Sequence, residues 1–146
     1  MRLHFGGDHA GVGLKAEMIA LARELGHEVT DHGTTSTDSV DYPDYAHTVA
    51  RAVLADAESR GVLICGTGIG VSMAANRHAG IRAAVCHDVF SARATRAHND
   101  ANVLCMGARV VGPGLAGAIL EAFLAGAFEG GRHERRVSKI EIDSAL

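Results

Sequence analysis

Residues 61–70 read Gly-Val-Leu-Ile-Cys-Gly-Thr-Gly-Ile-Gly, an apolar run that ends in Cys65 and passes into a glycine-rich turn. A short continuous apolar run beside glycine is typical of a buried strand, and residues 71–77 after the turn are predicted to be helical. Such a turn can point several backbone N–H groups at one spot, where the start of the next helix also favours an anion. Cys65 and Thr67 border that spot and offer a base or nucleophile and a hydroxyl donor. The segment therefore indicates an enzyme.

Strand and helix signals alternate along the rest of the chain. Strands are predicted at residues 2–5, 27–31, 62–64, 81–86 and 101–106. Helices are predicted at residues 14–25, 45–55, 71–77, 90–98 and 114–125, with a polar helix from residue 130 through residue 146. This alternation predicts a three-layer, doubly wound (Rossmann-like) α/β domain with a five-stranded parallel sheet and a C-terminal helical arm, formed as a single domain by residues 1–146. Ligands bind such domains at the carboxyl ends of the strands, where Asp8, His9 and Cys65 fall.

The composition fits one globular domain, with 146 residues of which 47% are apolar and 21% charged. A formal net charge of −3 gives no basis for nucleic-acid binding. We expect a cytoplasmic protein, because no apolar stretch is long enough to span a membrane and no signal-peptide pattern is present. Three cysteines without a framework spacing indicate reduced thiols. Of these, Cys86 and Cys105 are flanked by apolar strand residues and are predicted to be buried and structural.

Neither a metal nor a cofactor is predicted. The sequence has no Cys-x-x-Cys and no pair of histidines at helical i,i+4 spacing. Residues 6–11, Gly-Gly-Asp-His-Ala-Gly, leave a dinucleotide site as an alternative, with Asp31 as the ribose ligand. That alternative is disfavoured because Asp8 replaces the middle glycine and would face the pyrophosphate. Residues 66–70 are not a P-loop, since no lysine follows the last glycine.

Polar residues elsewhere add candidates for a site. His98 and Asn99 lie between the fourth helix and the fifth strand, where a histidine either caps the helix or takes part in function. Arg132 and Arg136 are four residues apart, so they share one helix face and could hold a phosphate from two sides. A solvated basic end is the alternative for this pair. Arg109, after the fifth strand, is a further candidate anion ligand.

Together these residues suit proton transfer beside a carbonyl, which needs a base, donors for an enediolate oxygen and a grip on a phosphate. The chain resembles the ribose-5-phosphate isomerase B family over nearly its whole length, roughly residues 2–140. The segments that carry the resemblance are, in order, residues 6–11, 41–43, 64–70, 74–76, 80–83, 91–93, 98–104, 107–109, 129–133 and Arg136.

The resemblance implies a cofactor-free aldose–ketose isomerase that interconverts ribose 5-phosphate and ribulose 5-phosphate through a cis-enediolate. By this resemblance Cys65 is the base between C2 and C1, and Thr67 stabilises the enediolate oxygen. His98 opens the furanose ring, with Asp8 assisting. The substrate contacts that the resemblance implies are His9, Tyr42, Gly66, Gly68, Ile69, Gly70, Asn99, Arg109, Arg132 and Arg136, of which His9, Arg132 and Arg136 hold the phosphate.

The resemblance also implies a homodimer or a dimer of dimers whose sites draw residues from two subunits. Val71 stands where one branch of the family has a glutamate, so the chain is similar to the cysteine branch. Three alternatives remain: an isomerase of allose 6-phosphate, an isomerase of a tetrose phosphate, or a non-catalytic sugar-phosphate sensor. The presence of Cys65, Thr67 and His98 together disfavours the sensor.

Overall fold

Five parallel strands form one sheet in the order β2-β1-β3-β5-β4 in the computed structural model, which describes residues 1–142. The strands are β1 (Arg2–Gly7), β2 (Glu28–Asp31), β3 (Arg60–Cys65), β4 (Ala83–Val85) and β5 (Val103–Gly107). The predicted five-stranded, doubly wound sheet is therefore confirmed. The last strand along the chain, β5, pairs with both β3 and β4 and lies between them, so β2 and β4 are the outermost strands.

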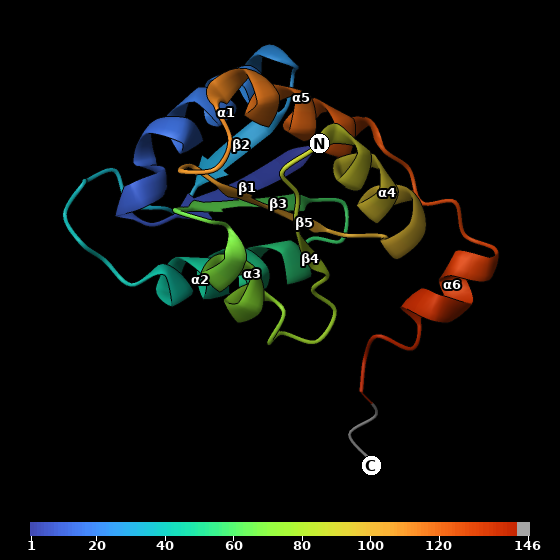
Figure 1. Cartoon of the computed structure of the whole chain (residues 1–146). Coiled ribbons are helices and arrows are strands. Elements are labelled where there is room, and N and C mark those ends of the chain that lie inside the picture. Colours follow the sequence, from blue (N-terminus) through green and yellow to red (C-terminus); the bar gives the residue numbers. More distant parts are fainter. Residues whose placement is uncertain (143–146) are drawn as a thin grey trace.

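Helices cover both faces of the sheet (Figure 1). Helices α1 (Val12–Glu24), α4 (Val89–Asn99) and α5 (Pro113–Ala125) lie on one face, and α2 (Tyr42–Leu54) and α3 (Ile69–Ala75) lie on the other. A short 3-10 turn, η1 (His9–Gly11), connects β1 to α1. Among residues 1–142, no helix combines the length and the apolar character needed to cross a membrane.

The apolar run in β3 follows from its central position. Val62 and Ile64 belong to the core under α1 and α5, whereas Leu63 and Cys65 belong to the core under α2 and α3. Each side chain is fully or almost fully buried. Because both faces are covered, each of these four residues gains from burial, by about 1.5–3 kcal/mol for a large apolar side chain.

All five strands run the same way, so the sheet has two chemically different edges. We call the edge where the strands end, at Cys65 and Gly107, the carboxyl edge. The opposite edge, where Arg60 and Val103 begin their strands, is the amino edge. Each helix between two strands carries the chain from the carboxyl edge back to the amino edge, which determines where the candidate residues lie.

The C-terminal helix is shorter than the sequence pattern predicts. Helix α6 spans Arg132–Val137, residues 138–141 form turns and a bend, and residues 143–146 of the prediction lie outside the described part. Helix α6 packs beside α4 and projects from the main body (Figure 1). A polar helix with so few partners gains little from packing, so it does not extend. Glu141 instead accepts a hydrogen bond from the Gly80 N–H at 2.7 Å, which ties the tail to the loop before β4.

Candidate active site

The thiol of Cys65 lies beneath the glycine turn at the carboxyl edge. Its Sγ accepts a hydrogen bond from the Gly68 N–H at 3.1 Å, and the residue is only 5% exposed. Gly68 has a φ of +77°, and a Cβ at this position would lie 2.9 Å from the carbonyl carbon of Met106. The turn therefore requires glycine both for its backbone conformation and for its close contact with β5.

Thr67 and Arg109 complete the turn. The Thr67 Oγ1 accepts a hydrogen bond from the Ile69 N–H at 3.3 Å, which leaves the hydroxyl hydrogen for a ligand. The Arg109 N–H donates to the Gly66 carbonyl at 3.0 Å. A Cβ at Gly66 would meet the Arg109 Nη1 at 3.3 Å, so the guanidinium lies over the turn. A thiol, a hydroxyl and a cation thus meet at one place.

The loop after β1 adds a carboxylate and an imidazole to the same edge. Asp8 is buried, and its Oδ1 accepts a hydrogen bond from the Ala10 N–H at 3.0 Å. The His9 Nδ1 accepts from the Val40 N–H at 3.2 Å. This contact assigns the ring proton of neutral His9 to Nε2, which can donate to an anion. Val40 was not singled out in the sequence, because a backbone N–H leaves no signal in side-chain chemistry.

Tyr42 provides one wall of this region. It begins α2, and its ring packs so closely on Gly70 that a Cβ there would lie 2.7 Å from the ring carbons. We refer to the predicted residues that the structure collects here as the carboxyl-edge group. Its members are Asp8, His9, Tyr42, Cys65, Gly66, Thr67, Gly68, Ile69, Gly70 and Arg109.

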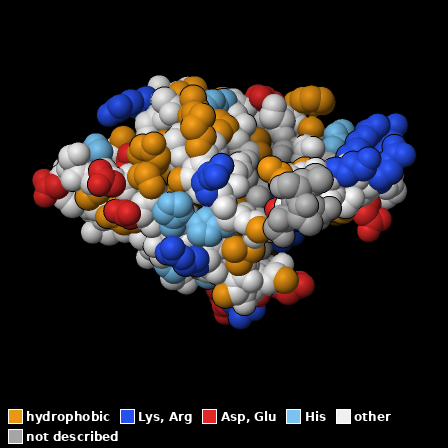
Figure 2. Space-filling view, turned by 90° about the horizontal axis from the view of Figure 1, so that it is seen from below, with side chains coloured by type: hydrophobic (Ala, Val, Ile, Leu, Met, Phe, Trp, Pro, Cys, Tyr) orange, Lys and Arg blue, Asp and Glu red, His pale blue; other side chains and the backbone are white. Residues whose placement is uncertain are grey.

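The other predicted residues lie at the amino edge. His98 and Asn99 end α4, and Arg132 and Arg136 are in α6 beside it. Figure 2 shows the positive side chains of α6 gathered at one end of the molecule. The length of β5, about 13 Å, separates the two edges. One chain therefore does not bring the amino-edge group of His98, Asn99, Arg132 and Arg136 to Cys65.

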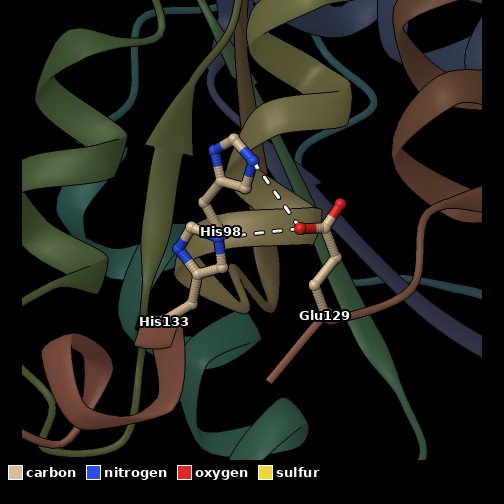
Figure 3. Close-up of side chains that lie close together, drawn as sticks. All are labelled: His98, Glu129 and His133. Atoms are coloured by element: carbon tan, nitrogen blue, oxygen red, sulfur yellow. Dashed lines mark ion pairs between the residues drawn. The ribbon is translucent and has the colours of Figure 1, made fainter. Parts of the chain in front are cut away.

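The amino edge also contains a cluster that sequence analysis missed. The rings of His98 and His133 stack with centroids 4.4 Å apart and planes 12° from parallel (Figure 3). The Glu129 Oε2 lies 4.0 Å from the His98 Nε2 and 3.6 Å from the His133 Nε2. Burial, followed by the neighbouring His98 and the cation of Arg132, lowers the pKa of His133. The i,i+4 spacing of Glu129 and His133 was the available signal.

This cluster has a donor set that a divalent cation can use. One nitrogen from each ring and one oxygen of Glu129 all lie within 4.8 Å of one another. However, the lone pair of a ring nitrogen lies in the plane of its ring, and two stacked, nearly parallel planes do not meet at the position of one ion, whereas a bound metal requires the lone pairs to converge. Either His98 or His133 would have to rotate before the cluster could hold a metal.

The structure disfavours the dinucleotide alternative, because Asp31, its predicted ribose ligand, forms an ion pair with Lys15. Both carboxylate oxygens of Asp31 lie 2.6 Å from the Lys15 Nζ, and Oδ1 also accepts from the Gly33 N–H at 2.8 Å. The glycine pattern has a packing explanation as well, because a Cβ at Gly11 would lie 2.3 Å from the Ile64 carbonyl oxygen. Asp31 is thus committed to a buried ammonium and is not available to bind a ribose.

The two remaining cysteines are structural, as predicted. Cys86 and Cys105 are 1% and 0% exposed, and all three cysteines are free thiols. Burial raises the pKa of Cys86 to about 11, with a smaller effect from Asp88. Burial also raises the pKa of Cys105 well above its ordinary value. Both side chains therefore stay protonated and act as small apolar residues.

Comparison with known proteins identifies the class. A model of the ribose/galactose isomerase family matches residues 3–140, so the chain belongs to that family and is a sugar-phosphate isomerase. The chain is 52% identical over 139 residues to ribose-5-phosphate isomerase B of Escherichia coli, covering 95% of this chain and 93% of the relative.

Solved structures agree with this assignment. The fold matches that of Clostridium thermocellum ribose-5-phosphate isomerase B with a TM-score of 0.94 and 50% identity, over 96% of this chain and 95% of the other. It matches ribose 5-phosphate isomerase B of Anaplasma phagocytophilum with a TM-score of 0.91 and 52% identity, over 96% of each chain.

Proposed function

We propose that this protein interconverts ribose 5-phosphate and ribulose 5-phosphate through a cis-enediolate, without a cofactor. The Cys65 thiolate removes the proton from C2 of the open-chain aldose, and the electron pair moves to form the enediolate. The resulting thiol returns a proton to C1 as the C2 oxygen becomes the ketone, the proton of the C2 hydroxyl passes to the oxygen on C1, and the thiolate is regenerated. Thr67 and the N–H groups of the turn stabilise the negative oxygen of the intermediate.

The position of the Cys65 sulfur carries this proposal. It lies at the end of β3, accepts the Gly68 N–H at 3.1 Å and is bordered by Thr67. The thiolate is the form of cysteine that accepts a proton, and the donated hydrogen bond fixes where the sulfur lies relative to the turn. Arg109 and the Nε2 of His9 supply positive charge and a donor for the phosphate at the same edge.

Ring opening is assigned to His98, assisted by Asp8, and this assignment needs a second copy of the chain. His98 lies at the amino edge of its own chain, so it meets a Cys65 only if two chains pack with opposite edges together. In a homodimer or a dimer of dimers, each site then combines the carboxyl-edge group of one copy with the amino-edge group of the other. Arg132 and Arg136 would complete the phosphate grip in this arrangement.

Subunit complementation tests the shared site. Cys65→Ala and His98→Asn are each expected to be inactive alone, because every site in either homodimer lacks one residue. When the two variants are co-expressed or refolded together, half of the dimers are mixed, and each mixed dimer has one intact site. We expect about a quarter of the wild-type activity to return in the mixture.

A matched pairing provides the control. Cys65→Ala mixed with Asp8→Asn should stay inactive, because both changes lie in the carboxyl-edge group and each site of a mixed dimer keeps one of them. Equal recovery in the two mixtures, or no recovery in either, would show that the site is not divided between chains in this way.

The substrate is tested by direct assay. The purified protein is incubated with ribose 5-phosphate, allose 6-phosphate or erythrose 4-phosphate, and ketose formation is followed. Conversion of the pentose supports the proposal. Conversion of only the hexose or the tetrose would retain the mechanism and reassign the substrate. Binding without conversion of any of the three would favour the sugar-phosphate sensor.

A further inference from the structure

His87 is a polar residue at the carboxyl edge that the proposed reaction does not use. It follows β4, which ends at Val85, and its Nε2 accepts a hydrogen bond from the Gly107 N–H at 3.2 Å. The last backbone contact between these strands is the Cys86 N–H donating to the Cys105 carbonyl at 3.1 Å. Beyond that point β4 offers no backbone carbonyl to the Gly107 N–H, and the Nε2 of His87 accepts the hydrogen bond instead.

The N–H that donates to His87 is part of the peptide that packs against the glycine turn of residues 66–70, which we call the catalytic turn. A Cβ at Gly68 would lie 2.9 Å from the carbonyl carbon of Met106, and a Cβ at Gly107 would lie 2.7 Å from the backbone of Thr67. The Met106–Gly107 peptide is therefore the support of the turn. Its carbonyl carbon touches Gly68, and its N–H is held by His87.

The next residue fixes His87 in this position. The Asp88 carboxylate accepts from the Ser91 N–H at 2.6 Å and from the Ser91 hydroxyl at 2.8 Å, which caps the start of α4. The backbone that carries His87 is thus held between the end of β4 and a capped helix. A fixed backbone lets one imidazole hydrogen bond define the position of the peptide.

We propose that His87 is a positioning residue for the catalytic turn. Its neutral ring, protonated on Nδ1, accepts a hydrogen bond from the Gly107 N–H. This bond keeps the Met106–Gly107 peptide in the position at which the Gly68 N–H can donate to the Cys65 sulfur. This inference rests on the proposed function, in which the turn stabilises the enediolate. The predicted consequence of losing the bond is slower chemistry with little change in substrate affinity.

Two substitutions of His87 separate the hydrogen bond from the space that the ring fills. His87→Leu removes the acceptor, whereas His87→Gln places an amide oxygen at nearly the same reach as Nε2. His87→Asn is too short to reach Gly107 and replaces the leucine variant if that one does not fold. His27→Leu, which removes an imidazole from the amino edge, is the matched control.

Two readouts are measured: kcat and KM with ribose 5-phosphate, and the rate at which iodoacetamide alkylates Cys65 at fixed pH. In His87→Leu we expect kcat to fall about tenfold, while KM stays within about threefold. Cys65 alkylation should slow about threefold or more, because the Gly68 N–H that donates to the sulfur is displaced. His87→Gln should restore both values, and His27→Leu should change neither.

A folded His87→Leu or His87→Asn protein with wild-type kcat and alkylation rate would overturn the proposal. A folded His87→Gln protein as impaired as the leucine variant would overturn it too, since the acceptor would then not be what matters. The alkylation rate does not depend on turnover. If the wild-type protein isomerises none of the sugar phosphates, the proposed function fails, and alkylation alone decides the role of His87.

Discussion

Replacing Gly68 with alanine perturbs the catalytic turn in a way whose cost can be worked out from the structure. At a φ of +77°, an alanine loses about 1–2 kcal/mol relative to glycine. Its methyl carbon would also lie 2.9 Å from the Met106 carbonyl carbon, whereas ordinary contact begins at 3.4 Å. The turn and β5 must therefore separate by 0.5 Å (3.4 − 2.9). Overpacking against backbone adds about 1–3 kcal/mol, so we expect Gly68→Ala to lose about 2–5 kcal/mol in the free energy of unfolding.

Two other glycines separate the two contributions. Gly26 has a φ of +85° with nothing within 4 Å of a Cβ, so Gly26→Ala should lose only the conformational term, about 1–2 kcal/mol. Gly13 lies within α1 in open space, and Gly13→Ala should gain about 0.5–1 kcal/mol. Urea denaturation of the three variants and the wild type gives these differences directly.

Activity provides the second measurement for Gly68→Ala. Moving the turn by about half an ångström displaces the N–H that bonds to the Cys65 sulfur, and we expect turnover to fall about tenfold beyond any loss of folded protein. Turnover should be unchanged in the Gly26 and Gly13 variants. If Gly68→Ala lost no more stability than Gly26→Ala and kept full turnover, the close contact between the turn and β5 would not constrain the site.

The remaining predictions concern the buried ion pair, the thiol and the effect of pH. Asp31→Asn leaves the ammonium of Lys15 buried without a counter-ion and should cost about 3–5 kcal/mol by urea denaturation. Lys15→Met should cost less, because Asp31 is 27% exposed and can be hydrated. Cys65→Ala should lower turnover by about 10²–10⁴-fold while calorimetric binding of ribose 5-phosphate is retained, and equal loss of both would contradict its assignment as the base. Burial, followed by the paired imidazole, lowers the pKa of His4 and of His78 below 6.5, so the unfolded chain binds protons more readily than the folded one. Stability from these two residues is complete above about pH 6.5 and is lost as the pH falls below it, and denaturation curves at several pH values should show this direction.

Much of the fold could be predicted because the sequence pattern has a direct physical cause. The apolar run at Val62–Cys65 indicates a strand covered on both faces, and β3 is the central strand of the sheet. The position of β5 inside the sheet could not be predicted, since local patterns do not specify which strands pair. The C-terminal helix was predicted too long because its sequence has no glycine or proline after Val137 that would indicate an end.

The candidate site was predicted in part for the same reason. The residues of the carboxyl-edge group follow strands, and parallel strands bring their ends together, so Asp8 and Cys65 could be expected at one edge. His98 was grouped with them by its chemistry and by family resemblance, although the end of a connecting helix lies at the opposite edge. Contacts that involve backbone groups, such as His87 with Gly107, depend on three-dimensional packing and left no pattern in the sequence.

Because β5 lies between β3 and β4, one side of β3 stays unpaired until β5 has been synthesised. Residue 103 is made 38 residues after Cys65 (103 − 65). At ribosomal speed this takes about 2–8 s, and until β5 is available one side of β3 has no neighbour. An apolar strand with an open edge can pair with another chain. Chains in which β3 has been released but β5 has not yet joined the sheet are therefore the forms of this protein most exposed to aggregation through β3.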